Sequence, residues 1–331
     1  MTITADFTLP EIHCPFPSAF AHSRHSAGAE VKQAMSTVLH GSTGNSVRRA
    51  VSGIHLVDYA GRLYPDVTAD GLQTIAWYFS FFSLLDDWSE QQDGDGHPDT
   101  PGLIQHLHRA ALRLLDYPDA DSNDPRILEL AHVVRPLSRL LSATANPDIV
   151  ERFRIALERA LQARIWELDH LRTGSVPSLA VYPRLRRQSS MALPLLELHP
   201  ALLELPTTAQ SLDHPAVRQL RTMLLNCVLW SNDLLSLARE LRERSCMNLA
   251  LVLQEDLGCD LQRAVTEVGQ MIKREALAYL LLKEQLPRIG ISSSDELASV
   301  TALLDREERW YADSIQWHKS PRYQGDPVQA Q

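Results

Sequence analysis

Helical periodicity extends through almost the whole chain and constrains its fold more than any other feature. From about Ala27 onward, nearly every stretch has the pattern of a helix. No alternating segment bounded by turn residues is long enough to propose a strand. The sequence therefore predicts an all-α fold. Helices are expected at about 46–63, 70–90, 101–116, 126–142, 148–172, 177–198, 215–243, 260–286 and 293–317.

The sequence contains no stretch that marks a linker, and we expect one domain over residues 1–331. Three prolines and the absence of a helical period predict an extended N-terminal strap over about 1–25. The last residues, about 324–331, are expected to form a flexible tail.

Composition excludes several classes of function. The net charge is −9 and lysines and arginines form no run, which argues against a nucleic-acid partner. No apolar run approaches the roughly 20 residues of a membrane span, and the first residues do not resemble a signal peptide. The four cysteines form no CxxC pair, so we expect reduced thiols in a cytoplasmic protein.

An acidic cluster ends the apolar stretch FSFFSLLDDWSE at residues 79–90. Asp86 and Glu90 are four residues apart and share a helix face, with Asp87 beside them. Carboxylates that close together repel one another, and Mg²⁺ bound by oxygen ligands removes that repulsion. A solvated acidic helix end is the alternative. The segment 91–102, rich in Gly, Pro and Asp, is expected to be a flexible loop that can act as a lid.

The residues before the acids favour the metal site. Phe79, Phe82 and Ser83 fall on the same helix face as Asp86, one and two turns earlier. The acids would then lie at the rim of an apolar cavity, which suits a substrate with one charged and one apolar end.

A second polar row follows the apolar run 223–230. Asn232, Ser236 and Glu240 recur every four residues and present an amide oxygen, a hydroxyl and a carboxylate, all hard donors that Mg²⁺ prefers. Any exposed helix face can show the same spacing. Two such helices facing each other in a bundle would form a metal cluster with an open side.

Two further segments carry candidate anion-binding groups. Arg184, Arg186 and Arg187 precede Ser189-Ser190 and Pro194, a combination that predicts a break in the helix. Near the C-terminus, Arg322 and Tyr323 follow a proline and could fold over a cavity mouth as a pair of donors. A surface arginine cluster and a plain cationic tail are the respective alternatives.

In combination, these segments resemble a class I terpene synthase of the bacterial type. The opening CPFP, the Tyr64-Pro65 junction, the DDWSE motif, the Arg186 region, the NDLLSLARE motif and the closing RY come in that family's order and spacing. The resemblance covers almost the whole chain. It implies a single α-helical bundle around a central apolar cavity, with lyase activity on a prenyl diphosphate.

The resemblance also implies roles for individual residues. Asp86, supported by Asp87 and Glu90, would bind two of three Mg²⁺ ions, and Asn232, Ser236 and Glu240 would bind the third, with Mn²⁺ as a substitute. Arg186 would sense the diphosphate, with Ser189 as linker and Ser190 as effector. Arg239, where a lysine is common in the family, would join Arg322 and Tyr323 in binding diphosphate.

Four aromatic side chains are candidates for contact with the carbocation. Phe79, Phe82, Trp310 and Trp230 offer π faces to cationic centres, although each could instead be core packing. Phe82 and Trp310 match pocket positions in the family.

The substrate is expected to be farnesyl diphosphate and the product a cyclic or linear sesquiterpene. Because Ser83 is small and leaves room one turn above Asp86, geranylgeranyl diphosphate is the alternative. A prenyl chain-elongating transferase would have two aspartate-rich motifs, and a non-catalytic isoprenoid-binding protein is a more distant hypothesis. A homodimer is compatible with the sequence.

Overall fold

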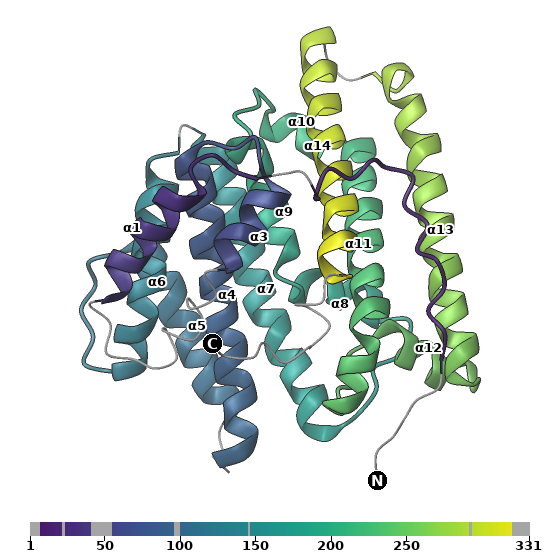
Figure 1. The fold of residues 1–331 in the computed structure, drawn as a ribbon, viewed down its shortest axis with the longest axis horizontal. Helices are drawn as coiled ribbons and strands as arrows, with labels where there is room; N and C mark the ends of the chain where they lie inside the picture. The colour runs from purple at the N-terminus through teal and green to yellow at the C-terminus, as the bar shows by residue number, and fades with distance from the viewer. Residues whose placement is uncertain are drawn as a thin grey trace. The chain divides into compact units, whose positions relative to one another are not determined.

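A computed structural model of the chain describes residues 7–21, 24–40, 55–95, 100–144, 146–290 and 293–319. Every regular element in these ranges is a helix, which confirms the predicted fold class (Figure 1). None of the helices described is both long and apolar enough to cross a membrane.

The chain divides into two compact units, each named here after its central helix. The α4 unit comprises Ala21–Leu168 and Glu197–Glu204. The α11 unit comprises Met1–Phe20, Asp169–Leu196 and Leu205–Gln331.

Helix α4 is the central helix of the α4 unit and packs against α1, α3, α5 and α6. Leu72, Phe81 and Leu84 on this helix are fully buried. The helices of this unit are α1 (Gly28–His40), α3 (His55–Leu63), α4 (Ala69–Asp95), α5 (Thr100–Asp116), α6 (Pro125–Ser142), most of α7 (Pro147–Thr173) and the end of α9 (Ala192–Leu202).

Helix α4 continues past the acidic cluster. The expectation of a loop over residues 91–102 is wrong for 91–95, which are helical, and for 100–102, where α5 has already begun. The sequence has no proline between Glu90 and Pro98, so nothing in residues 91–95 prevents α4 from continuing. Residues 96–99 lie outside the described ranges.

Helix α11 has the same central position in the α11 unit and packs against α8, α10, α12, α13 and α14. The helices of this unit are α8 (Tyr182–Ser189), α10 (Ala209–Asp213), α11 (Pro215–Arg242), α12 (Leu249–Leu257), α13 (Leu261–Gln285), the 3₁₀ turn η1 (Leu286–Arg288) and α14 (Ser294–His318). The short α12 was not predicted. Asn248 caps its N-terminus, and Gly258, with φ of 57°, ends it.

Residues 7–20 form no helix and run along α13 and α14 (Figure 1). The side-chain amide of Gln262 bonds both the N–H and the carbonyl of Thr8. Phe16 packs edge-on against Tyr279, with ring centroids 5.6 Å apart. At the end of the segment, the buried Asp313 carboxylate accepts hydrogen bonds from the Ser18 hydroxyl and from two main-chain N–H groups. These contacts hold the segment to the α11 unit.

Candidate active site

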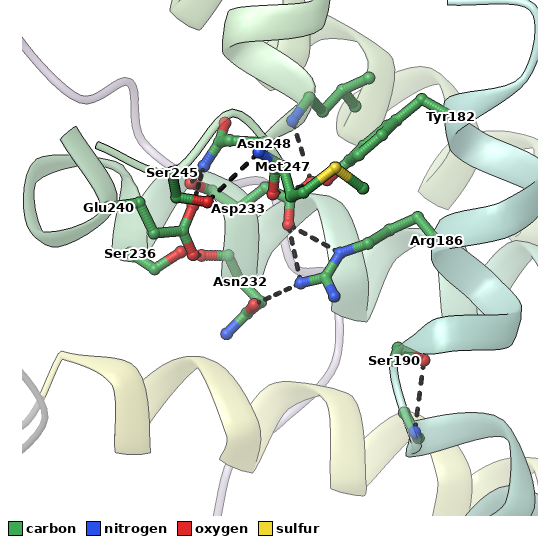
Figure 2. Close-up of polar contacts among 12 residues, drawn as sticks. Tyr182, Arg186, Ser190, Asn232, Asp233, Ser236, Glu240, Ser245, Met247 and Asn248 are labelled. Atoms are coloured by element: carbon green, nitrogen blue, oxygen red, sulfur yellow. Dashed lines mark hydrogen bonds and ion pairs between the residues drawn. The ribbon is translucent and has the colours of Figure 1, made fainter. Parts of the chain in front are cut away.

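Three oxygen-bearing side chains lie in a row on α11. Asn232, Ser236 and Glu240 follow one another at intervals of one helical turn and therefore share a face (Figure 2). The Ser236 Oγ donates a hydrogen bond of 2.7 Å to the main-chain carbonyl of Asn232, one turn earlier. The hydroxyl keeps its lone pairs for another partner.

Glu240 is held by the beginning of the next helix. The Nδ2 of Asn248 donates to Glu240 Oε2 at 2.8 Å and to the main-chain carbonyl of Asp233 at 2.6 Å. The same amide caps α12 through its Oδ1. Burial raises the pKa of the Glu240 carboxyl, and the negative charge of Asp233 raises it further. A cation beside Glu240 would oppose both effects.

Arg186 connects α8 to this row. Its Nε and Nη2 donate to Asp233 Oδ1 at 3.1 and 3.0 Å, and its Nη2 also donates to Asn232 Oδ1 at 3.0 Å. The other carboxylate oxygen of Asp233 accepts from the Tyr182 hydroxyl at 2.8 Å and from the Leu249 N–H at 3.1 Å. The arginine predicted to sense diphosphate is thus bonded directly to a predicted metal ligand (Figure 2).

The other predicted anion-binding groups are placed differently. Arg184 is exposed, and Arg187 donates to Asn226 Oδ1 at 3.0 Å. Arg239 lies on α11 with its Nε 3.8 Å from Glu243 Oε2. Arg322 and Tyr323 lie outside the described residues, so their role stays a prediction.

The predicted helix break occurs directly after the turn that carries Arg186. Helix α8 ends at Ser189, α9 begins at Ala192, and Met191 between them has φ of 58°, in the left-handed region that side chains disfavour. Pro194, which together with Ser189-Ser190 predicted the break, lies in the first turn of α9, where a missing N–H costs no helical hydrogen bond. The left-handed backbone at Met191 lies within the break itself.

The two serines at the break differ in their bonding. The Ser190 Oγ donates to the Arg187 carbonyl at 3.1 Å and accepts from the Ala192 N–H at 3.3 Å. The Ser189 Oγ is buried and has no hydrogen-bond partner within the described residues. A buried hydroxyl without a partner costs about 1–3 kcal/mol, which a rearrangement at the break could recover.

In the α4 unit, an arginine holds the first acid of the DDWSE motif. Asp86 Oδ1 accepts a hydrogen bond of 2.6 Å from Arg164 Nη2 on α7. The Arg164 guanidinium also lies over the Phe82 ring, 5.3 Å from its centroid. Asp87 and Glu90 are in α4, but their side chains are outside the described part of the structure.

The predicted common face of α4 is present. Phe79, Phe82, Ser83 and Asp86 are each half-buried and fall at helical spacings of three and four. The described side chains between them are buried: Ser80, Phe81, Leu84 and Leu85. This face therefore combines two aromatic rings, a small polar residue and a carboxylate.

The predicted pocket aromatics lie in both units. In the α4 unit, Phe79 stacks on Tyr59 with ring centroids 5.1 Å apart and planes at 22°. In the α11 unit, Trp310 on α14 and Trp230 on α11 are 5% and 7% exposed. Their burial is compatible with core packing as well as with a pocket wall.

The donor set on α11 fits a hard divalent cation. Amide, hydroxyl and carboxylate oxygens one turn apart are ligands that Mg²⁺ accepts together with water and substrate oxygens. Burial and the Asp233 charge raise the pKa of the Glu240 carboxyl although the Arg186 charge acts in the opposite direction. No three His, Cys, Asp or Glu side chains gather in one place among the described residues, so a cation here would need Asn232 and Ser236 as well.

Two residues at these sites were not predicted. Arg164 continues the buried stripe of α7 that includes Leu157 and Leu161, and a charge on such a stripe indicates an oppositely charged partner. His318 has its Nε2 2.8 Å from the Asn232 Nδ2, and burial lowers the pKa of His318 to about 4. No local pattern predicts this contact, because the two residues are 86 positions apart.

The chain is similar to a known protein family and to several known proteins. Residues 78–276 match the family described as "Terpene synthase family 2, C-terminal metal binding". Alpha-muurolene synthase of Coprinopsis cinerea is 26% identical over 98% of this chain and 76% of its own length. Sesquiterpene synthase Agr1 of Cyclocybe aegerita is 25% identical over 96% of this chain and 88% of its own. The crystal structure of the SVS_A2 protein from ancestral sequence reconstruction has a TM-score of 0.76 at 23% identity, over 95% of this chain and 91% of that protein.

Proposed function

The chain belongs to terpene synthase family 2, and from that premise we propose that it is a Mg²⁺-dependent synthase acting on a linear prenyl diphosphate. The enzyme ionises the C–O bond, releases diphosphate and lets the carbocation rearrange to a cyclic or linear terpene. The observation that carries this proposal is the row Asn232, Ser236 and Glu240 with Arg186 bonded to it.

Two groups of residues hold the metal ions. Asn232, Ser236 and Glu240 would hold one Mg²⁺, and Asp86 would hold two more with the support of Asp87 and Glu90. Bound Mg²⁺, or Mn²⁺ in its place, supplies positive charge that stabilises the departing diphosphate. The ionisation then needs no proton donor.

Arg186 binds the diphosphate through its guanidinium fork. The Nε and Nη2 of this fork donate to Asp233 and Asn232, so binding diphosphate exchanges these hydrogen bonds for bonds to phosphate oxygens. A planar fork suits a pair of phosphate oxygens. Arg239, Arg322 and Tyr323 add further donors when the site closes.

Ser189 and Ser190 link this event to the apolar part of the substrate. They follow Arg186 at the break between α8 and α9, where the backbone is already in an unusual conformation. If Arg186 moves, the Ser189 hydroxyl can gain a hydrogen-bond partner. The Ser190 hydroxyl can then leave the Arg187 carbonyl for another acceptor.

Aromatic faces stabilise the carbocation that remains. Phe79, Phe82 and Trp310 each contribute about 0.5–2 kcal/mol to a cationic centre above the ring. The position of the Arg164 guanidinium over the Phe82 ring supports this role for Phe82. Exclusion of water preserves the cation until it has rearranged.

We propose farnesyl diphosphate as the substrate and a sesquiterpene as the product. The relative from Cyclocybe aegerita is a sesquiterpene synthase that aligns with 96% of this chain. Geranylgeranyl diphosphate is the alternative, because the small Ser83 lies on the same half-buried face as Asp86 and leaves room for a longer chain.

Incubation with the C10, C15 and C20 prenyl diphosphates tests the proposal. Diphosphate release and hydrocarbon products are measured with Mg²⁺ and with EDTA. We expect Mg²⁺-dependent release, with C15 products dominating. Release from the C20 substrate alone would select the alternative substrate, and binding of all three without release would overturn the proposal in favour of a non-catalytic isoprenoid-binding protein.

A further inference from the structure

The Asn232 amide is engaged at both ends. Its Oδ1 accepts from Arg186 Nη2 at 3.0 Å, and its Nδ2 lies 2.8 Å from His318 Nε2. Arginine can only donate, so the amide oxygen must be the atom that faces Arg186. The nitrogen therefore points away from Arg186 and needs an acceptor on its own side (Figure 2).

The other ring nitrogen of His318 fixes which tautomer is present. Nδ1 lies 2.6 Å from the main-chain carbonyl of Ser314, one turn earlier in α14. Because a carbonyl only accepts, Nδ1 carries the proton and Nε2 offers its lone pair to Asn232. A single chain of hydrogen bonds thus connects the α14 backbone to Arg186 through one imidazole and one amide.

The orientation of this amide decides whether Asn232 can act as a metal ligand. Rotation by half a turn about its last torsion would exchange the oxygen for an NH₂ group, which cannot bind a cation. That torsion has a broad, roughly two-fold profile and is not fixed by sterics alone. His318 accepts from the amide in one of the two orientations, so it selects the one that leaves the oxygen on the side of Arg186.

We propose that His318 is a positioning residue for the metal ligand Asn232. It keeps the amide oxygen on the side where Arg186 holds it, so that a cation can take this oxygen when Arg186 moves to diphosphate. This inference rests on the proposed function, since it assigns a residue to the same metal site. Outer partners of metal ligands typically change metal affinity by about 10–100-fold.

Glutamine and asparagine carry the same amide group at different lengths, so substituting each for His318 gives a matched pair of variants. In His318→Gln, the longer side chain can place an oxygen near the position of Nε2 and accept from Asn232. In His318→Asn, the shorter one reaches only the position of Nδ1, so it can bond the Ser314 carbonyl but not Asn232. His199→Phe removes another imidazole in the α4 unit, 2.8 Å from the Tyr64 hydroxyl, and controls for loss of a buried histidine.

The test measures Mn²⁺ binding to the full chain in the presence of inorganic diphosphate, by electron paramagnetic resonance of free Mn²⁺. We expect His318→Asn to weaken the affinity of one bound ion at least about tenfold, His318→Gln to restore most of it, and His199→Phe to leave it unchanged. Equal affinity in His318→Asn and the parent would overturn the inference, as would equal losses in His318→Asn and His318→Gln.

Repeating the measurement in an Asn232→Asp variant distinguishes orientation of the amide by His318 from a general packing role of this histidine. Asn232→Asp replaces the amide with two equivalent oxygens, so the orientation no longer matters. Adding His318→Asn to it should then cost little Mn²⁺ affinity, and a full loss there would also overturn the inference. If the parent binds Mn²⁺ with the expected response to these variants but releases no diphosphate from any prenyl substrate, the proposed function alone fails.

Discussion

Arg186 makes three hydrogen bonds with the two nitrogens Nε and Nη2, and this geometry decides which substitutions it tolerates. Two of these bonds go to Asp233 and one to Asn232. Lysine preserves the charge but has neither the planar fork nor the reach to bind two oxygens at fixed positions. A loss of activity in a charge-preserving variant would therefore report on geometry and not on charge.

We expect Arg186→Lys to lower kcat/KM for the prenyl diphosphate by about tenfold or more. A hydrogen bond to a charged group is worth about 1.5–3 kcal/mol, and lysine would lose at least one such bond to the diphosphate. Steady-state kinetics at saturating Mg²⁺ measures the effect. Arg184→Lys, at an exposed position two residues earlier, should stay near the parent value. The reverse order of sensitivity would mean that Arg184 binds the diphosphate.

Glu240 carries a charge that the metal-free protein accommodates poorly. Burial, followed by the Asp233 charge, raises the pKa of Glu240 above its value in the unfolded chain. The protonated carboxyl therefore adds stability at low pH, and this contribution is lost as the pH rises through the folded-state pKa. At neutral pH the ionised group is a cost that a bound cation offsets.

Glu240→Gln should accordingly raise the Tm of the metal-free protein at neutral pH. The variant should also lose less stability than the parent as the pH rises above the pKa of an ordinary carboxyl group. It should also shrink the stabilisation by Mg²⁺, which for the parent is about 2.7 kcal/mol at a hundredfold excess over Kd. Scanning calorimetry at several pH values, with and without Mg²⁺, measures both quantities. A variant as pH-dependent as the parent would contradict this account of Glu240.

At the level of helices, α7 provides the cation that pairs with Asp86 on α4. Arg164 donates to Asp86 at 2.6 Å and lies over Phe82, while its own side chain is 10% exposed. The proposed binding of Mg²⁺ to Asp86 would compete with this contact. Asp86 is 40% exposed, so the pair itself adds little to stability, on the order of 1 kcal/mol or less.

Arg164→Gln should lower the Mg²⁺ concentration needed for half-maximal diphosphate release, because the competing cation is gone. Arg152→Gln is the matched control on the same helix: it removes a 2.8 Å ion pair with Glu197 and should leave the Mg²⁺ requirement unchanged. A titration of Mg²⁺ against initial rate measures the shift. If Arg164→Gln needed more Mg²⁺ than the parent, Arg164 would be assisting the metal site and not competing with it.

The helices themselves were largely predictable because their boundaries are local. Tyr64-Pro65 ends α3, Pro215 begins α11, and the four-residue spacing from Asn232 to Glu240 identified one face without any tertiary information. The misses follow from the same locality. Helix α12 is short and depends on the Asn248 cap. The break after α8 was predicted from the Ser189-Ser190 pair and Pro194, but the left-handed backbone at Met191 was not.

The contacts around the candidate site were less predictable, because they join residues far apart in sequence. Arg164 and Asp86 are 78 positions apart, and His318 and Asn232 are 86 apart. Periodicity indicates which face of a helix is buried, but not which residue of another helix meets it. A charged residue on an apolar stripe, as at Arg164, is the clearest local hint of such a partner.

For the whole molecule, we propose that each of the two polar motifs is needed for the Mg²⁺-dependent reaction. The chain has a net charge of −9 and no basic run, so a diphosphate has to be bound by metals and a few placed arginines. The α4 unit carries Asp86, and the α11 unit carries Glu240 with the network around Arg186. Loss of either motif should therefore stop turnover without unfolding the helices.

The need for both motifs can be tested by measuring diphosphate release from farnesyl diphosphate by the parent, Asp86→Ala and Glu240→Ala, each with Mg²⁺ and with EDTA. Far-ultraviolet circular dichroism of each variant serves as the control for folding. We predict Mg²⁺-dependent release by the parent, and activity below a few per cent of the parent value in both variants with helical content intact. Substantial Mg²⁺-dependent release by either folded variant would contradict the assignment of both motifs to the metal site.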